Sequence, residues 1–155
     1  MKSYDLDQVD RNILRMLQTQ ADISHAALAE HVGASPASCW RRIKAMEAAG
    51  LLKNTVRLVD AEVLGRGLIV FCQVRMKTHD PSTRRDFERF VESHSEVLEC
   101  YSMSGEWDYL LRVVASDVGD YERLLMHGIL THDAVAASSS HFALKRVKYS
   151  TALPV

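Results

Sequence analysis

Hydrophobic positions in the first fifty residues recur at the three- and four-residue spacing of an α-helix. Three such stripes follow one another: Val9, Ile13 and Leu17, then Leu28 and Val32, then Cys39, Ile43 and Met46. Asp5 or Asp7 can cap the first helix, and Ser24 and Gly33 supply a start and a stop for the second. Ser35-Pro36 puts an N-cap and a good first helical residue before the third. The second and third helices therefore form a helix-turn-helix pair.

From residue 68 onward the pattern changes to β-α-β-β-α-β, in which alternating apolar residues mark the strands. The expected strands are Leu68–Met76, Val97–Ser104, Trp107–Val114 and Val135–Val147, and the expected helices begin at Asp80-Pro81 and Ser116-Asp117. Gly105-Glu106 has the spacing of a hairpin turn between the second and third strands. This order is that of the ferredoxin-like fold, with two helices on one face of a four-stranded antiparallel sheet.

The opposite face of such a sheet has no helices to cover it. It is expected to expose apolar side chains, namely Ile69, Phe71, Leu110 and Phe142. Pairing with a second copy of the chain is the natural way to bury them, so we expect a homo-oligomer.

A change of pattern at Asp60–Gly67, which carries two glycines, marks a hinge between two domains. We expect an α+β chain in which residues 1–60 form a winged helix-turn-helix domain and residues 61–155 a ferredoxin-like βαββαβ domain. Within the first domain, Leu51–Val59 is either a short wing strand or a plain connecting segment.

Composition narrows the function. The chain is 47% hydrophobic and 25% charged over 155 residues, as in an ordinary globular protein of one or two domains. No apolar run reaches the roughly 20 residues of a membrane span, and the N-terminus is too polar for a signal peptide. We therefore expect a cytoplasmic protein without a membrane partner. The three cysteines, Cys39, Cys72 and Cys100, lie far apart in apolar patterns and are expected to be buried, reduced thiols.

The chemistry of an enzyme is not indicated. The seven histidines lack the paired spacing of metal ligands, and there is neither a glycine-rich phosphate loop nor a nucleophile elbow. We expect no metal, no cofactor and no catalytic residues.

Positive charge gathers on and after the third helix, although the whole chain has a net charge of −1. Residues 35–59 contain five cations against Glu47 alone, a net charge of +4. The cations are Arg41, Arg42, Lys44, Lys53 and Arg57. Small side chains near the start of the helix and cations further along are what a helix in the major groove needs. A helical hairpin with a solvated basic face is the alternative.

Several motifs together resemble the Lrp/AsnC family, the feast/famine regulators of bacteria and archaea. They are LDQVDRNIL (6–14), VGASPASCWRRIKAMEAAGLL (32–52), SGEWDYLL (104–111) and LKRVK (144–148). The resemblance runs along nearly the whole chain. It implies a transcription regulator that binds double-stranded DNA, dimerises through its second domain, responds to a small-molecule effector such as an amino acid, and assembles further into an octamer.

The resemblance also implies site residues. The family reads DNA at positions corresponding to Ser35, Pro36, Ala37, Ser38, Arg41 and Arg42, to which the charge pattern adds Lys44 and Lys53. The family's effector loop corresponds to Ser104, Gly105, Glu106, Trp107, Asp108 and Tyr109, and two hydroxyls on the last strand to Ser138 and Ser140. The sequence departs from the family pattern at Trp40, where an aliphatic residue is usual, and at His141.

The effector chemistry is consistent with these residue types. An α-amino acid presents an ammonium group that Asp108 can pair, and a carboxylate that backbone N–H groups around Gly105 can hold. Ser138 and Ser140 share one face of a strand and can bond either group. The alternative is a simple hairpin turn with solvated serines.

Two other classes of protein stay open at this point. A haem-pathway decarboxylase related to the family would bring histidine and arginine into a cleft for a tetrapyrrole, and a ligand-binding module would have no affinity for DNA. The intact cationic helix 35–48 favours the regulator.

Overall fold

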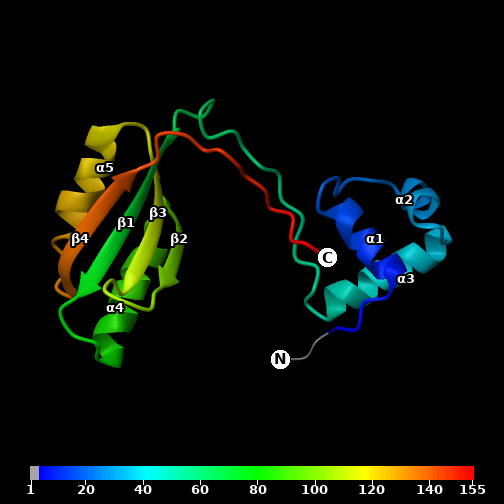
Figure 1. The fold of residues 1–155 in the computed structure, drawn as a ribbon, viewed down its shortest axis with the longest axis horizontal. Coiled ribbons are helices and arrows are strands. Elements are labelled where there is room, and N and C mark those ends of the chain that lie inside the picture. The colour runs from blue at the N-terminus through cyan, green and yellow to red at the C-terminus, as the bar shows by residue number, and fades with distance from the viewer. Residues whose placement is uncertain (1–3) are drawn as a thin grey trace. The chain divides into compact units, whose positions relative to one another are not determined.

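The computed structural model describes residues 4–155, which form two compact units (Figure 1). The first comprises the residues up to Arg57 together with Val147–Val155, and the second comprises Leu58–Arg146. The closing segment therefore packs with the helices of the first unit, although the sequence pattern had placed it with the sheet.

The first unit has three helices, α1 (Gln8–Leu17), α2 (His25–Val32) and α3 (Pro36–Ala48). Each begins at an N-cap, Asp7, Ser24 or Ser35, whose side chain accepts a hydrogen bond from a backbone N–H of the first turn. The predicted stripes pack together as one small core, in which Ile13, Leu28, Cys39 and Met46 are fully buried. The three-helix prediction is confirmed.

The segment after α3, for which the sequence left a wing strand or a plain connecting segment open, is the connecting segment. Residues 53–60 contain no strand and no helix, so the structure shows the connecting segment and not a wing strand. The described residues of the first unit contain no strand with which this segment could pair, and a lone strand leaves its backbone groups unsatisfied.

The second unit contains a four-stranded antiparallel sheet in the order β2-β3-β1-β4. Its strands are β1 (Leu68–Met76), β2 (Val97–Ser102), β3 (Tyr109–Ala115) and β4 (Val135–Phe142). The helices α4 (Pro81–Glu92) and α5 (Val118–Leu124), with a π-helical turn at Leu125–Ile129, lie against the sheet (Figure 1). This is the predicted ferredoxin-like arrangement.

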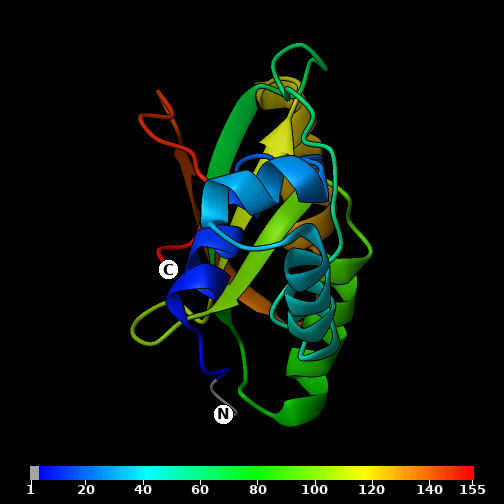
Figure 2. The same ribbon diagram turned by 90° about the vertical axis from the view of Figure 1, so that its right-hand side faces the viewer.

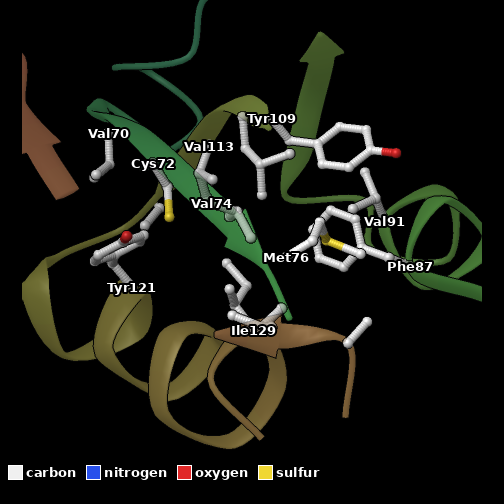
Figure 3. Close-up of a cluster of buried hydrophobic side chains, with 14 residues drawn as sticks. Val70, Cys72, Val74, Met76, Phe87, Val91, Tyr109, Val113, Tyr121 and Ile129 are labelled. Carbon is white, nitrogen blue, oxygen red and sulfur yellow. The ribbon is translucent and has the colours of Figure 1, made fainter. Parts of the chain in front are cut away.

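Alternation along the strands separates the two faces of the sheet. On β1, Val70, Cys72 and Val74 are fully buried, whereas the residues between them are partly or well exposed. Figure 3 shows this core, with the rings of Phe87 and Tyr109 at one end and Tyr121 beside Cys72 at the other.

The structure corrects four expectations in the second unit. The hairpin loop runs from Met103 to Asp108, so the connection is longer than Gly105-Glu106. β4 ends at Phe142 instead of Val147. The Phe142 ring lies on the helix side, 5.7 Å from the ring of Tyr121, so it is absent from the open face. Cys100 is exposed, whereas Cys39 and Cys72 are buried as expected.

The closing segment is attached to α1 by polar and apolar contacts. The Gln18 side chain donates to the Leu153 carbonyl oxygen (3.1 Å) and accepts from the Leu153 N–H (2.6 Å). Arg15 Nη2 donates to the Val155 carbonyl oxygen (2.6 Å), and the Val155 side chain packs against the helical core. In Figures 1 and 2 the end of this segment lies beside α1. The first unit thus contains the segments of the chain that precede and follow the sheet in sequence.

Candidate DNA interface and effector site

The outward face of α3 presents a mixture of small and cationic side chains. Ala37, Arg41 and Lys44 are exposed, and Trp40 between them is 52% exposed. The Arg41 side chain has no hydrogen bond or ion pair within residues 4–155. Within that range the Lys44 side chain pairs only with exposed Glu47 one turn later (2.7 Å). Because ion pairs on an open surface contribute little, both cations are available to a polyanion.

The start of α3 has a structural role that also shapes this face. The Ser35 hydroxyl accepts a hydrogen bond from the Ser38 N–H (3.2 Å), and Pro36 occupies the first helical turn. Small side chains and a helix N-terminus with unpaired N–H groups allow a phosphate to approach the backbone closely. Lys53 lies beyond the helix as an exposed side chain.

Arg42 does not share this outward face. Its Nη1 donates to Asp10 Oδ1 (2.7 Å) and to Asp7 Oδ2 (2.8 Å), at the N-terminal end of α1. Asp10 is only 5% exposed, and it forms a capping box with Asp7. The structure therefore places Arg42 between α3 and α1, apart from Arg41, with which the sequence had grouped it.

Electrostatics strengthen this link. The backbone N–H of Asp10, and after it the Arg42 guanidinium, hold the pKa of Asp7 below its usual range. Hydrogen bonds to Asp10 and Asp7 raise the pKa of Arg42, so its guanidinium stays charged. Arg42 thus stabilises the helix pair that presents α3.

The second set of predicted residues lies in and beside the loop between β2 and β3. Ser104, Gly105 and Glu106 are exposed, whereas Trp107 and Asp108 are half-buried. Gly105 has φ +119°, a conformation that favours glycine and gives the loop its sharp bend.

The Asp108 carboxylate is held by the protein on one side. Its Oδ2 accepts the Met76 N–H (2.8 Å) at the irregular end of β1, and its Oδ1 lies 3.3 Å from His79 Nδ1. The side chain is 22% exposed. Asp108 Oδ2 therefore satisfies a backbone N–H at the end of β1, and the exposed part of the carboxylate can contact a ligand.

Tyr109 belongs to the core. Its ring is 1% exposed and lies 5.1 Å from the ring of Phe87. Its hydroxyl donates to Glu88 Oε1 (2.7 Å) and accepts from Arg84 Nε (3.2 Å). Burial raises the pKa of Tyr109, and the arrangement makes it a packing residue under α4.

The two serines of β4 lie on the helix-covered face, because they pair with the core residues Val74 and Cys72 of β1. The Ser140 hydroxyl is hydrogen-bonded to the hydroxyl of Tyr121. Ser138 lies opposite Val74, whose carbonyl oxygen accepts the Asp108 N–H (2.9 Å). The structure thus brings Ser138 and Asp108 to the same end of β1 and leaves Ser140 deeper in the sheet.

Arg75 also lies at this end, although the sequence motifs did not include it. Its guanidinium is 5.1 Å from the centre of the Trp107 ring and 3.9 Å from Glu106 Oε1, with 46% of the side chain exposed. Alternation could have found it, because Arg75 shares the open face of β1 with Ile69 and Phe71. A guanidinium over an indole, beside a glycine loop, is a suitable partner for a carboxylate.

Residues 4–155 contain no helix long and apolar enough to cross a membrane. Within the same residues, no group of three or more His, Cys, Asp or Glu side chains is arranged to hold a metal ion.

A helix-turn-helix with a cationic second helix, followed by a ferredoxin-like sheet domain, defines a two-domain DNA-binding regulator. Residues 6–53 match the winged helix-turn-helix DNA-binding family, and residues 69–153 match the Lrp/AsnC ligand binding domain. The chain belongs to the Lrp/AsnC family of DNA-binding transcriptional regulators.

Similar proteins agree with this assignment. The chain is 35% identical over 150 residues to the glutamate uptake regulatory protein of Zymomonas mobilis, covering 97% of this chain and 91% of that one. It is equally identical to the DNA-binding transcriptional activator DecR of Escherichia coli, covering 97% and 99%. The transcriptional regulator NMB0573 of Neisseria meningitidis, solved with L-Met, has a TM-score of 0.93, 34% identity and 97% coverage of both chains. These relatives are regulators, which favours a regulator over the haem-pathway decarboxylase.

Proposed function

We propose that the chain regulates transcription by placing α3 in the major groove, with Arg41, Lys44 and Lys53 as its cationic contacts. The observation that supports this most directly is the exposed guanidinium of Arg41 on the outward face of a capped helix, where it has no ion-pair partner among the described residues. Ser35, Pro36, Ala37 and Ser38 would line the close approach to the DNA backbone. Arg42 is left out of this set, because its guanidinium is engaged by Asp7 and Asp10.

The variant Arg41→Ala tests this assignment. Arg41→Ala should weaken binding to a duplex selected from a random library by roughly 1–3 kcal/mol if the guanidinium reaches a base, and should reduce the salt slope by about 1 if it reaches a phosphate. The variant should unfold like the wild type, because the Arg41 side chain has no hydrogen bond or ion pair with any residue from 4 to 155. Unchanged affinity and an unchanged salt slope together would remove Arg41 from the interface.

We further propose that two copies pair through the open face of the sheet and that dimers assemble into an octamer in the cytoplasm. Ile69, Phe71 and Leu110 supply an apolar surface on that face, and Phe71 is 38% exposed. A two-fold pair would present two copies of α3 to a pseudo-palindromic site. Phe71→Glu should shift the mass measured by light scattering toward the monomer, because it puts a charge at the centre of the interface; an unchanged mass would refute this interface.

The effector, in this proposal, is an amino acid bound at the end of β1. Its ammonium group would meet the exposed edge of Asp108, and its carboxylate would meet the Arg75 guanidinium and the N–H groups of the loop at Gly105. Trp107 would pack against the ligand, with Ser104 and Glu106 at the loop's rim. Ser138 would lie beneath the site, on the helix-covered face of the neighbouring strand. Tyr109 and Ser140 would support the site from below through their internal hydrogen bonds.

A thermal-unfolding screen with the twenty common amino acids tests the effector site. A ligand at one hundred times its Kd adds about 2.7 kcal/mol to the native state, enough for a clear rise in melting temperature. Arg75→Ala should abolish that rise for the amino acid that gives it in the wild type. A screen in which no amino acid raises the melting temperature would contradict amino-acid binding, whereas a rise that persists in Arg75→Ala would remove only Arg75.

A further inference from the structure

We propose that Trp40 is a base-reading residue, whose indole packs against thymine 5-methyl groups in the major groove. The inference rests on the DNA binding proposed for α3, and it adds the residue that would make this helix prefer particular bases.

The first observation is that Trp40 has no role in the fold. It is 52% exposed, and it lies outside the helical core that its neighbour Cys39 helps to form. Within residues 4–155 its side chain makes no hydrogen bond, ring contact or cation–π contact. An aromatic side chain of this size offers a large apolar area and a rigid shape to a partner, at a low entropic cost.

The second observation is the arrangement of its neighbours. Ala37 lies one turn before Trp40 and Lys44 one turn after it on the same helical face, with Arg41 alongside. The small Ala37 side chain leaves room for the indole to reach the groove floor, and the two cations fit the phosphates on either side. This combination of charge and apolar surface suits a duplex better than it suits an apolar protein partner.

The third observation concerns what is left to read bases. Arg42 is committed to Asp7 and Asp10, and the Ser35 hydroxyl caps the helix. The large exposed side chains that remain on this face are Trp40, Arg41 and Lys44, and Trp40 is the apolar one. An apolar side chain recognises the methyl group of thymine, so Trp40 can distinguish thymine from the other bases while Arg41 meets the DNA backbone.

The test uses the full-length protein and a duplex that the wild type selects from a random library. Trp40→Ala should weaken binding to this duplex by roughly fivefold to fiftyfold, with the slope of affinity against salt unchanged, because apolar contacts release no counterions. Arg41→Ala is the contrasting variant, since a phosphate contact should change the slope. Thermal unfolding of Trp40→Ala should match the wild type, because the side chain lies outside the core.

Replacing thymine by deoxyuracil at single positions removes the methyl group alone. At a contacted thymine this change should weaken wild-type binding by about fourfold, the equivalent of one buried methylene group, and should have no effect on Trp40→Ala. Equal effects on both proteins at every thymine would overturn the proposal, as would wild-type affinity in Trp40→Ala. Failure of the wild type to select any duplex would instead overturn the DNA binding on which the proposal rests.

Fluorescence supplies a second measurement in the conservative variant Trp40→Phe, which leaves Trp107 as the remaining tryptophan. DNA should change the emission of the wild type, because the Trp40 indole moves from water into the groove, and should leave the emission of Trp40→Phe unchanged although the variant still binds. An equal change in both proteins would place the indole outside the interface.

Discussion

The outward face of α3 and the loop between β2 and β3 both carry polar side chains. The two regions differ in whether those side chains already have partners within the protein. Arg41 on α3 has no partner within residues 4–155, whereas Asp108 in the loop already accepts the Met76 N–H. The reason lies in the backbone. A helix satisfies its own N–H and C=O groups, so its outward side chains remain available; a loop at an irregular strand end must use side chains for that purpose. A ligand at the loop therefore has to share its contacts with the fold.

The largest effect that would sharpen this comparison is expected from Arg42→Ala. The substitution leaves the Asp10 carboxylate, which is 5% exposed, without its cation. We expect the first unit to lose about 2 kcal/mol of unfolding free energy, a value reduced because the guanidinium is partly exposed. Urea unfolding followed by helical circular dichroism measures this loss.

Arg41→Ala is the matched control for that experiment. It removes the same side chain from the preceding position on the helix, where no ion pair with residues 4–155 is lost. If both variants unfold like the wild type, the contacts of Arg42 with α1 do not stabilise the domain, and the distinction between the two arginines fails.

Asp108→Ala should have the next largest effect. It leaves the Met76 N–H without an acceptor in a partly buried position, which should cost about 1 kcal/mol of stability. Asp108→Asn keeps an acceptor oxygen and removes the charge, so it should unfold like the wild type while losing any stabilisation by an amino acid. Thermal unfolding with and without ligand measures both. Equal stability of all three proteins would mean that the loop does not depend on this carboxylate.

Acid should weaken the first unit in a way that depends on Arg42. Because the pKa of Asp7 is lower in the folded protein than in the unfolded chain, its contribution is present above the unfolded value of about 3.9 and is lost as the pH falls below it. Urea unfolding between about pH 5 and about pH 2 should show a smaller loss of unfolding free energy in Arg42→Ala than in the wild type. Parallel curves would contradict this coupling.

The smallest effect is expected at the closing segment. Gln18→Ala removes both hydrogen bonds to Leu153, which are exposed, so it should cost about 0.5 kcal/mol. The direct measurement is the hydrogen-exchange rate of the Leu153 amide, which should rise in Gln18→Ala and stay at the wild-type value in Gln20→Ala. Equal rates in all three proteins would show that Gln18 does not hold the segment.

Local rules predicted the helices of the first unit well. Caps, stripes and a basic face depend on residues three or four positions apart, so Ser24, Ser35 and the buried Cys39 could be placed from the sequence. The partner of Arg42 could not, because Asp7 and Asp10 reach it only after α1 has packed on α3.

The candidate effector site was harder to predict because it depends on strand register. Tyr109 and Leu111 share the buried face of β3, but nothing local in the sequence indicates that α4 covers this face. In the same way, Ser140 meets Tyr121 and Arg75 meets Trp107 across distances in sequence that no spacing rule covers.

The attachment of Val147–Val155 to α1 has a consequence for biosynthesis. A ribosome releases the three helices before the sheet, and the segment that bonds Gln18 and Arg15 emerges only after every strand of the sheet has been made. The DNA-binding half is therefore translated before the sheet domain, but its contacts with this segment can form only after the sheet domain has been synthesised.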